Sequence, residues 1–328
     1  MKLLVCGGAG FIGSNFARLR AQQGDEVVVL DKLTYAGRRE NLDGVEHRFV
    51  HGAIEDPAKA AEAMDGVDAV VNFAAETHVD RSIAEPDAFV RTHGQGTYVL
   101  LEAARERDVR YVQVSTDEVY GSIAEGSFTE QSPLAPSSPY SATKAGADLL
   151  VGSYHDTFAM ETLICRGSNN YGPNQYPEKL IPLMVLNALH GDKLPVYGDG
   201  LQVRNWLFVE DFARGIGHVL EHGVPGEVYN VGGPDEETNI TVVQRIVEAV
   251  GGDPEQLIEY VTDRPGHDRR YSLGSEKVRA LGWTPQVHFA EGLPRTVDWY
   301  RDNAWWWEPI RSGDYRAYYE RQYGTRLG

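Results

Sequence analysis

The sequence predicts an α/β protein whose core is a doubly wound parallel sheet, with a smaller α/β domain in the C-terminal half. Three observations lead to this fold class. The chain begins with a short apolar strand that runs directly into a glycine-rich turn at residues 7–13. Strand-sized and helix-sized segments then alternate as far as residue 115. After about residue 170 the alternation loosens, and turn signals such as Gly172-Pro173 become frequent.

The first half of the chain contains the predicted strands and helices that alternate. Runs of apolar and β-branched residues predict strands at residues 2–6, 26–30, 47–50, 68–73 and 111–115. Helical patterns between them cover residues 11–23, 57–64 and 85–107. Parallel strands need crossover connections of one hand, so we expect these helices on both faces of the sheet.

Two later segments are expected to return to this first domain. One is a strand and helix at residues 206–220, and the other is a helix at residues 289–303. The predicted first domain therefore comprises residues 1–170, about 205–222 and 289–303. The second comprises residues 171–204, 223–288 and the 304–328 tail.

Composition excludes several classes of function. The 328-residue chain has a net charge of −17, which disfavours nucleic acid and anionic membrane surfaces as partners. Its longest apolar runs are strand-sized, so no transmembrane helix is expected. Cys6 and Cys165 cannot form a disulfide framework, and no Cys/His cluster has zinc spacing. We therefore expect a cytoplasmic protein without a metal site.

The glycine turn predicts a dinucleotide site. Gly7, Gly10 and Gly13 lie between a strand and a helix, where glycine permits a tight turn and close approach of the backbone to a pyrophosphate. Asp31 ends the second strand, and a carboxylate there would accept hydrogen bonds from the adenosine ribose. This favours NAD over NADP, although the nearby Lys32, Arg38 and Arg39 keep that preference moderate. The alternative is an ordinary strand-to-helix turn.

A second constellation follows the strand at residues 111–115. Tyr140 and Lys144 are four residues apart, on one face of a helix that Pro139 is suited to begin. A neighbouring ammonium and a bound nicotinamide cation are both expected to lower the pKa of the tyrosine, as a base for hydride chemistry requires. Alternatively, Tyr140 is a packed core aromatic and Lys144 a solvated surface charge.

Two adjacent acids complete the pattern. Asp117 and Glu118 follow Ser115 and Thr116 at the carboxyl end of a strand, the edge at which ligands bind in such sheets. Unequal environments could hold one carboxyl protonated and the other ionised. An enzyme that both oxidises its substrate and expels water needs this second donor and acceptor. The alternative is an exposed acidic loop.

At these residues the chain resembles the extended short-chain dehydrogenase/reductase family, and within it the dTDP-glucose 4,6-dehydratases. The matching segments are residues 7–13, 73–82, 115–121, 140–144, 168–173, 177–182 and 264–271. The resemblance implies a Rossmann-type sheet, NAD as cofactor and a homodimer with contacts through the helix near residues 97–107 and the helix that carries Tyr140. It also implies conversion of dTDP-glucose to dTDP-4-keto-6-deoxyglucose in deoxysugar biosynthesis.

The resemblance further implies a role for each site residue. Tyr140, with Thr116 and Lys144, would take the proton of the 4-hydroxyl group. Glu118 would take the proton from carbon 5, and Asp117 would protonate the departing 6-hydroxyl group.

The binding residues that the resemblance implies fall into two sets. The cofactor set is Gly7, Gly10, Phe11, Ile12, Gly13, Asp31, Lys32, Thr34, Ile54, Phe73, Ala74, Ala75, Thr92, Ser115, Tyr140, Lys144 and Asn170. The substrate set is Thr77, His78, Asn170, Glu178, Lys179, Leu180, Tyr197, Arg204, Asn239, Arg264 and His267.

The chain departs from the family pattern at a few positions. Ala53 replaces an aspartate that usually contacts adenine, and Gly167 replaces a cysteine near the nicotinamide. His93-Gly94 stands where Asn-Val is usual, which puts the local helix geometry in doubt. Asn205 replaces an acidic residue. None of these is a proposed acid, base or redox group.

Two other functions remain open. A nucleotide-sugar 4-epimerase would share the NAD site and the Tyr/Lys pair but would have no task for Asp117 and Glu118. A regulator that binds NAD and a nucleotide sugar without turnover would not need the acid and base residues at all.

Overall fold

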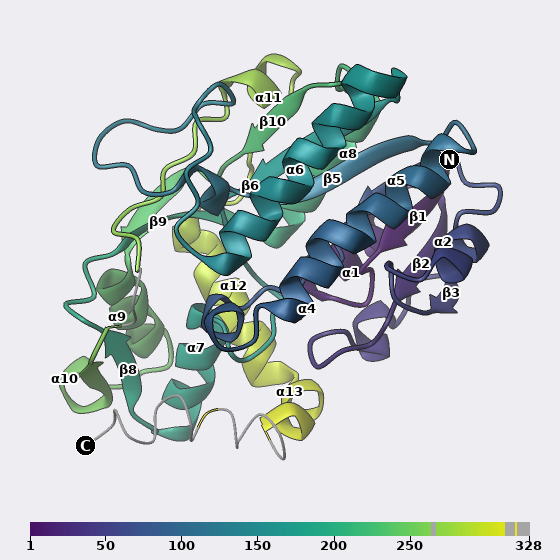
Figure 1. Cartoon of the computed structure of the whole chain (residues 1–328). Coiled ribbons are helices and arrows are strands. Elements are labelled where there is room, and N and C mark those ends of the chain that lie inside the picture. Colours follow the sequence, from purple (N-terminus) through teal and green to yellow (C-terminus); the bar gives the residue numbers. More distant parts are fainter. Residues whose placement is uncertain (264–266, 312–318, 320–328) are drawn as a thin grey trace.

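The computed structural model describes residues 1–263, 267–311 and 319. Its main feature is a seven-stranded sheet with strand order β10-β6-β5-β4-β1-β2-β3, in which every neighbouring pair is parallel (Figure 1). The strands are β1 (Lys2–Cys6), β2 (Glu26–Asp31), β3 (Arg48–His51), β4 (Ala69–Asn72), β5 (Arg110–Thr116), β6 (Thr162–Gly167) and β10 (Val228–Val231). The expected doubly wound parallel sheet is confirmed.

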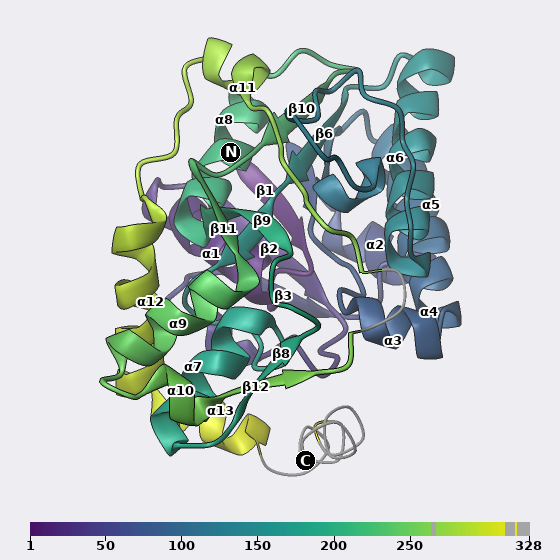
Figure 2. The same cartoon turned by 90° about the vertical axis from the view of Figure 1, so that its left-hand side faces the viewer.

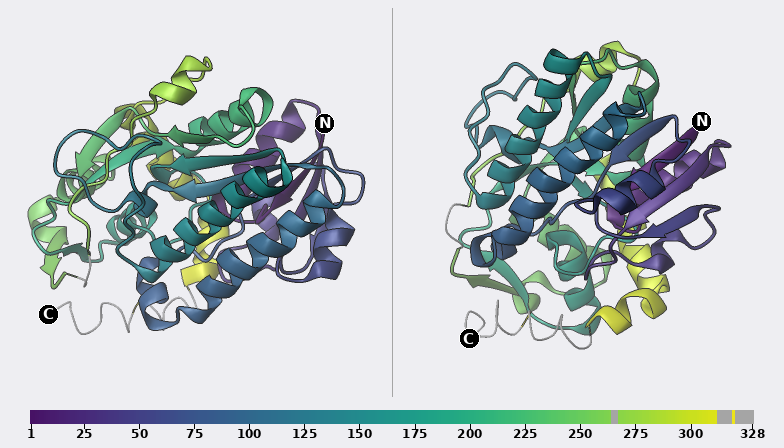
Figure 3. Two further views of the ribbon diagram at one scale, coloured as in Figure 1. Left: turned by 45° about the horizontal axis from the view of Figure 1, so that its top comes forward. Right: turned by 45° about the vertical axis from the view of Figure 1, so that its right-hand side comes forward.

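Helices cover both faces of this sheet. One face packs against α1 (Phe11–Gln22) and α8 (Val209–His222), and the other against α2 (Pro57–Ala63), α5 (Thr97–Arg105) and α6 (Pro139–Phe158). The blue α5 and the teal α6 run side by side in both views of Figure 3.

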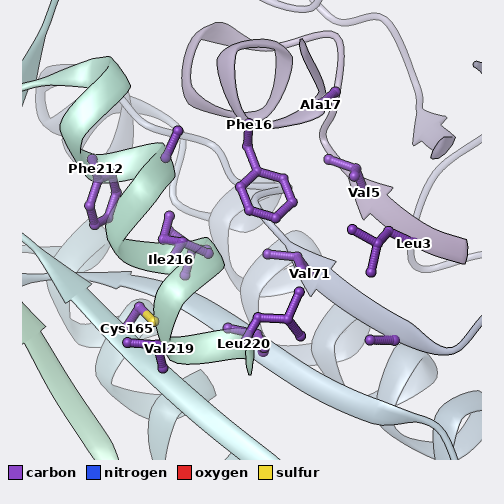
Figure 4. Packing of buried hydrophobic residues seen from close by; sticks show 14 of the residues in the cluster. Leu3, Val5, Phe16, Ala17, Val71, Cys165, Phe212, Ile216, Val219 and Leu220 are labelled. Atoms are coloured by element: carbon purple, nitrogen blue, oxygen red, sulfur yellow. The ribbon is translucent and has the colours of Figure 1, made fainter. Parts of the chain in front are cut away.

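The central strand β1 shows why two layers form. Successive side chains of a strand point to opposite faces. Leu3 and Val5 therefore enter the cluster with Phe16 of α1 (Figure 4), whereas Leu4 and Cys6 enter the cluster on the α5 side. Because β1 is apolar on both faces, it is suited to the middle of a covered sheet.

The second part of the molecule has its own core. Most of its helices lie in the lower half of Figure 2. Its sheets have the orders β11-β9-β7 and β12-β8. The strands are β7 (Asn169–Tyr171), β8 (Leu194–Tyr197), β9 (Val203–Phe208), β11 (Asp235–Thr238) and β12 (Ile258–Val261). The helices are α7 (Leu180–His190), α9 (Asn239–Ala249), α10 (Pro254–Leu257), α12 (Phe289–Asp302) and α13 (Ala304–Arg311).

The remaining elements are short. They are η1 (Arg39–Leu42), α3 (Val79–Ala84), α4 (Asp87–Phe89), η3 (Asp117–Tyr120) and α11 (Glu276–Ala280). In the part of the chain that the structure describes, no helix is long and apolar enough to cross a bilayer.

The helix expected at residues 85–107 differs from the prediction. It begins at Asp87, after Pro86, and a π-helical stretch, η2 (Val90–Gly96), separates α4 from α5. This stretch contains His93 and Gly94, the two residues that depart from the family pattern. Glycine has low helix propensity and tolerates such a change of pitch.

The packing of three segments differs from the expected domain assignment. The buried residues of α12, such as Leu293 and Val297, belong to the second core together with α7 and α9, not to the large sheet. Strand β9 pairs with β7 and β11, although α8, which follows it, does pack on the large sheet. Strand β10, expected in the second domain, joins the large sheet. The packing favours moving residues 289–302 to the smaller domain.

Candidate active site

The carboxyl ends of β1, β2, β4, β5 and β6 open into one cavity. All residues predicted to contact the cofactor or to act in catalysis line this cavity. They are Gly7, Gly10, Phe11, Ile12, Gly13, Asp31, Lys32, Thr34, Ile54, Phe73, Ala74, Ala75, Thr92, Ser115, Thr116, Asp117, Glu118, Tyr140, Lys144 and Asn170.

Two glycines of the turn have no room for a side chain. Gly7 has φ +71°, and a Cβ atom there would lie 2.6 Å from the backbone nitrogen of Ala74. A Cβ atom on Gly13 would lie 2.3 Å from the carbonyl oxygen of Gly7. The turn thus brings the N-terminus of α1 against the loop after β4, and the first N–H groups of that helix can meet a phosphate.

Asp31 ties the end of β2 to the glycine turn. Its carboxylate accepts hydrogen bonds from the backbone N–H groups of Ala9 (3.0 Å) and Leu33 (2.8 Å). Burial raises the pKa of Asp31, and the two backbone bonds oppose that rise. A carboxylate offers about four lone-pair sites, so the side chain can still accept ribose hydroxyl groups.

The basic residues beside Asp31 have partners of their own. Lys32 pairs with Glu76 at 3.0 Å, Arg38 pairs with Glu40, and the Arg39 guanidinium lies 4.0 Å from the centre of the Phe49 ring. Because protein groups engage these cations, they favour a 2′-phosphate less than the sequence suggested. The preference for NAD is correspondingly stronger.

The cavity fits a polar ligand such as NAD. Several buried side-chain oxygens that line it have no hydrogen-bond partner among the residues described. They belong to Ser115, Asp117, Asn169, Asn170 and Gln175. Buried polar atoms are costly when unpaired, so a ligand with several hydroxyl and amide groups suits this lining.

Helix α6 places Tyr140 and Lys144 in the cavity. It begins with a capping box between Ser138 and Ser141, and Pro139 occupies its first turn, as expected. Both functional side chains are buried. The Lys144 ammonium donates to the carbonyl oxygen of Val114 on β5 at 2.6 Å. This bond fixes the helix against the strand that ends at Thr116.

The expected lowering of the Tyr140 pKa is wrong for the protein's own groups. Burial and then the Glu118 carboxylate raise the pKa of Tyr140, whereas a hydrogen bond with Thr116 lowers it. Lys144 is itself desolvated, and burial lowers its pKa to about 8. The sequence could place Tyr140 and Lys144 on one face of a helix, but it could not show the desolvation that raises the pKa of the phenol.

Asp117 and Glu118 have unequal surroundings, as predicted. They lie in η3, directly after β5, where Thr116 caps the turn by accepting the N–H of Glu118 at 3.2 Å. Burial, and then the charge of Glu118, raise the pKa of Asp117 to about 8. The Asp117 carboxyl is therefore protonated at neutral pH and can act as an acid.

Part of the predicted substrate set lies at the cavity. Thr77, Asn170 and Lys179 line it, and the Lys179 ammonium donates to the carbonyl oxygen of Thr77 at 2.5 Å. His78 is buried at the N-cap of α3, and Leu180 begins α7 and packs on the second core.

Glu178 has partners inside the protein. It accepts from the Tyr35 hydroxyl at 2.8 Å and from the Arg81 guanidinium at 3.1 Å, and the Arg81 guanidinium also lies over the Tyr35 ring. This buried carboxylate ties Tyr35, which lines the cavity, to Arg81 of α3.

The other members lie outside the cavity lining. Tyr197 and His267 are neighbours, with ring centres 6.1 Å apart, and His267 bonds Asp263 at 2.6 Å. Arg204 lies over the ring of Tyr271, and its positive charge lowers the pKa of Asp117. Asn239 begins α9, with its side-chain oxygen buried and unpartnered among the described residues. Arg264 lies outside the described residues.

Some cavity residues were missed. Tyr35, Glu76 and Tyr176 line the cavity, and so does Phe212 of α8. Glu76 lies within the quoted segment at residues 73–82, so its position could have been noted. Phe212 comes from a helix far along the chain and carried no local signal.

Two departures from the family pattern have structural partners. A Cβ atom on Gly167 would lie 2.4 Å from the Phe212 ring, so Phe212 fills the space that a larger residue at 167 would need. Asn205 exchanges hydrogen bonds with the backbone of Gly233 at 2.8 and 2.9 Å. Ala53 is not part of the cavity lining. No group of metal-binding side chains occurs within the described ranges.

Comparison with known proteins agrees with this geometry. The family model described as GDP-mannose 4,6 dehydratase matches residues 4–296. The chain is 54% identical to the low-salt glycan biosynthesis protein Agl12 of Haloferax volcanii, over 92% of this chain and 98% of that protein. It is 51% identical to a dTDP-glucose 4,6-dehydratase of Streptomyces niveus, over 96% and 97% of the two chains.

A solved structure gives the same result. DesIV, a dTDP-glucose 4,6-dehydratase from Streptomyces venezuelae, was crystallised with NAD and TYD bound. It matches this fold with a TM-score of 0.92 and 53% identity, over 94% of this chain and 100% of that one. The chain therefore belongs to the NAD-dependent epimerase/dehydratase family, in its group of nucleotide-sugar 4,6-dehydratases.

Proposed function

We propose that the protein is an NAD-dependent dTDP-glucose 4,6-dehydratase that converts dTDP-glucose to dTDP-4-keto-6-deoxyglucose for deoxysugar biosynthesis. Near-full-length relatives and an NAD-bound structural neighbour support this activity. The observation that carries it is the buried Asp117, which has a pKa of about 8 and lies beside Glu118 in the cavity that also contains Tyr140. A protonated acid next to a second carboxylate is what removal of water requires.

The first proton step is assigned to Tyr140. When bound, NAD supplies a positively charged nicotinamide ring that accepts a hydride from carbon 4 of the sugar and returns it to carbon 6. Tyr140 takes the proton of the 4-hydroxyl group, and Thr116 holds the phenol through its hydrogen bond. Because the protein's own groups raise the pKa of Tyr140, positive charge at the cavity is needed to make it a base.

The elimination step is assigned to the two acids. A ketone at carbon 4 acidifies the hydrogen on carbon 5, which Glu118 removes. Asp117 donates its proton to the departing 6-hydroxyl group, so that water leaves. Carbon 5 is protonated again as the hydride returns to carbon 6, which completes the 4-keto-6-deoxy sugar. The charge of Glu118 is the second cause of the raised pKa of Asp117, so Glu118 helps to keep Asp117 protonated.

The two rival functions leave this arrangement unexplained. A 4-epimerase needs Tyr140 and Lys144 but has no use for a buried proton donor. A non-catalytic regulator would retain the cavity but would gain nothing from a desolvated acid, which costs stability. The acid pair therefore favours the dehydratase.

The nucleotide sugar is proposed to lie between Tyr140 and the smaller domain. Thr77, Asn170 and Lys179 line the cavity and are proposed to bind it. The predicted set beyond the cavity lining, with Arg204, Asn239 and His267, is proposed to bind the diphosphate and base. We also propose the two-domain division, with β9 and residues 289–302 reassigned to the substrate side and β10 reassigned to the NAD-binding side.

A homodimer through α5 and α6 is proposed as the working form. Tyr98 on α5 and Leu149 and Phe158 on α6 are large apolar side chains, each at least half exposed. These two helices lie side by side, so their exposed residues can form one apolar surface (Figure 1). We further propose a cytoplasmic location, because Cys6 and Cys165 are buried free thiols.

The test is product analysis with a panel of nucleotide-glucose substrates. Purified protein incubated with dTDP-glucose should yield a product lighter by one water, with no net change in the NAD pool. UDP-glucose and GDP-mannose serve as comparison substrates. A product of unchanged mass would identify an epimerase, and no product from any of them would favour the regulator.

A further inference from the structure

His93 is the buried titratable residue that the proposed chemistry leaves without a task. It is 2% exposed and lies in the π-helical stretch η2. π-helical turns concentrate at functional sites. The sequence had marked His93 only as a departure from the family pattern. Both of its ring nitrogens are engaged with segments that line the cavity.

The hydrogen bonds of His93 have a fixed direction. Its Nε2 accepts the backbone N–H of Glu76 at 3.1 Å, and a backbone N–H can only donate. The neutral ring must therefore carry its proton on Nδ1, which lies 2.8 Å from the Thr143 hydroxyl. That hydroxyl accepts from His93 and gives its own proton to the carbonyl oxygen of Tyr140 or Pro139, at 2.9 and 3.0 Å.

The ring also contacts the catalytic tyrosine. The ring centres of His93 and Tyr140 are 5.9 Å apart with edge-to-face geometry, and Phe89 packs against both rings. The His93 side chain thus touches the loop that contains Glu76, the turn of α6 between Tyr140 and Lys144, and the phenol itself. A shift of any one of these would change the distance from phenol to substrate.

The charges around His93 keep it neutral. Burial, and then the Lys144 ammonium on α6, hold the pKa of His93 well below its ordinary value, and Lys32 at the end of β2 acts in the same direction. Glu76 contributes its backbone N–H, and its carboxylate pairs with Lys32. A protonated ring would direct a second donor at the Glu76 N–H. The link from Glu76 through His93 to Thr143, called the His93 bridge below, therefore exists only in the neutral form.

We propose that His93 is a positioning residue for the dehydratase reaction. It joins the cavity loop at Glu76 to the helical turn that carries Tyr140 and Lys144. This role rests on the proposed function, because it concerns the placement of the phenol against the sugar. His93 touches no reacting atom and is not assigned a proton-transfer step.

Three variants separate the two halves of the bridge. His93→Gln keeps an acceptor near the position of Nε2 but loses the donor to Thr143. His93→Asn keeps a donor near Nδ1 but loses the acceptor for Glu76. Thr143→Val removes the hydroxyl and leaves η2 unchanged, so it tests the link even where a change at His93 prevents folding. Arg91→Gln, an exposed position on the same π-helical stretch, is the matched control.

We expect His93→Gln, His93→Asn and Thr143→Val each to lower kcat on dTDP-glucose about tenfold, as the loss of one hydrogen bond in the reacting geometry does, with KM unchanged. The double variant His93→Gln/Thr143→Val should be no slower than either of these single variants, because both changes remove the same hydrogen bond. Arg91→Gln should match the wild type. Wild-type kcat in both His93→Gln and Thr143→Val would overturn the proposal.

Nitrogen NMR of the His93 ring supplies a test that does not depend on turnover. The ring should stay neutral, with its proton on Nδ1, between about pH 5 and 8, where an ordinary histidine titrates. Titration within that range, or a proton on Nε2, would overturn the bridge. If the wild type forms no dehydrated product, the proposed function fails, and this spectrum still decides whether the bridge exists.

Discussion

At Asp117, the burial that makes the carboxyl a proton donor also lowers the stability of the folded protein. Its carboxyl is buried beside Glu118, and one of its oxygens has no partner among the described residues. That environment costs stability and produces a proton donor at neutral pH. The same burial that raises its pKa therefore has an effect on catalysis and an effect on stability, and each can be measured.

Asp117→Asn should separate the two chemical steps. The amide keeps the shape of the side chain but cannot donate an acidic proton to the 6-hydroxyl group. Dehydrated product should fall at least about 100-fold, the usual contribution of a general acid, while oxidation at carbon 4 stays near the wild-type rate. Rapid-quench mass spectrometry follows both species, with Glu125→Gln in an exposed loop as control. Equal loss of both steps would contradict the role of Asp117.

The same variant should change how stability depends on pH. The pKa of Asp117 is about 8 in the folded protein, against about 4 for an unfolded aspartate. Between these values the folded protein binds the extra proton, so this group's stabilising effect is complete below about pH 4 and is lost as pH rises through 8. Urea unfolding at pH 6 and pH 8 should show a smaller loss for Asp117→Asn than for the wild type. An equal loss of unfolding free energy between pH 6 and pH 8 in the two proteins would contradict the raised pKa of Asp117.

The limits of sequence reasoning are clear at single residues. Gly7, Gly13, Asp31 and Ser115 were predictable because short motifs place them next to strand ends, and strand ends meet at one edge of the sheet. The direction of the Tyr140 pKa shift was not predictable, because it depends on desolvation and therefore on the folded packing.

Among the elements, β6 and α8 each contribute a residue to the cavity lining, Gly167 and Phe212. Gly167 ends β6, and its missing side chain leaves the space that the Phe212 ring of α8 occupies. This pairing explains how a glycine can replace the usual cysteine without leaving a void. The sequence showed the departure at Gly167 but not its compensation by Phe212, because the two residues lie on elements far apart in the chain.

Gly167→Cys should therefore destabilise the protein. The added Cβ atom would lie 2.4 Å from the Phe212 ring, and overpacking of this kind costs about 1–3 kcal/mol. In a Phe212→Ala background the same change should cost much less, because the clash is gone. Denaturant unfolding of the two single variants and the double variant gives the coupling. Additive effects would show that Phe212 does not fill the space at Gly167.

Other elements show which parts of the secondary structure the hydrophobic periodicity of the sequence can predict. Apolar runs predicted five of the seven strands of the large sheet, β1 to β5, to within about two residues, because buried parallel strands are apolar on both faces. The sequence analysis assigned no strand to β6 or β10. Periodicity could not reveal the π-helical stretch in the helix after Pro86, which depends on local contacts of His93 and Gly96. Nor could it assign α12, because an apolar helix face does not by itself identify the core that it packs against.

The exposed apolar side chains of α5 and α6 form the surface through which we propose that the whole molecule dimerises. Leu149 is 66% exposed on α6, the most exposed of the large apolar side chains in the described part of the chain. Leu149→Glu should convert the proposed dimer to a monomer, because it places a charge in an apolar interface. Val224→Glu, at an exposed site in the loop after α8, is the control.

Analytical ultracentrifugation decides between the two states. The wild type and Val224→Glu should sediment as dimers, and Leu149→Glu as a monomer that keeps its fold. A wild-type monomer, or a Leu149→Glu dimer, would contradict assembly through these helices.

The central claim for the whole molecule is that one cavity carries out oxidation, loss of water and reduction on a single sugar. The most direct measurement uses dTDP-glucose with deuterium at carbon 4 and locates the label in the product by mass spectrometry and NMR. We predict dTDP-4-keto-6-deoxyglucose with the deuterium in its carbon 6 methyl group. Deuterium retained at carbon 4 of a sugar that has lost no water would contradict the account.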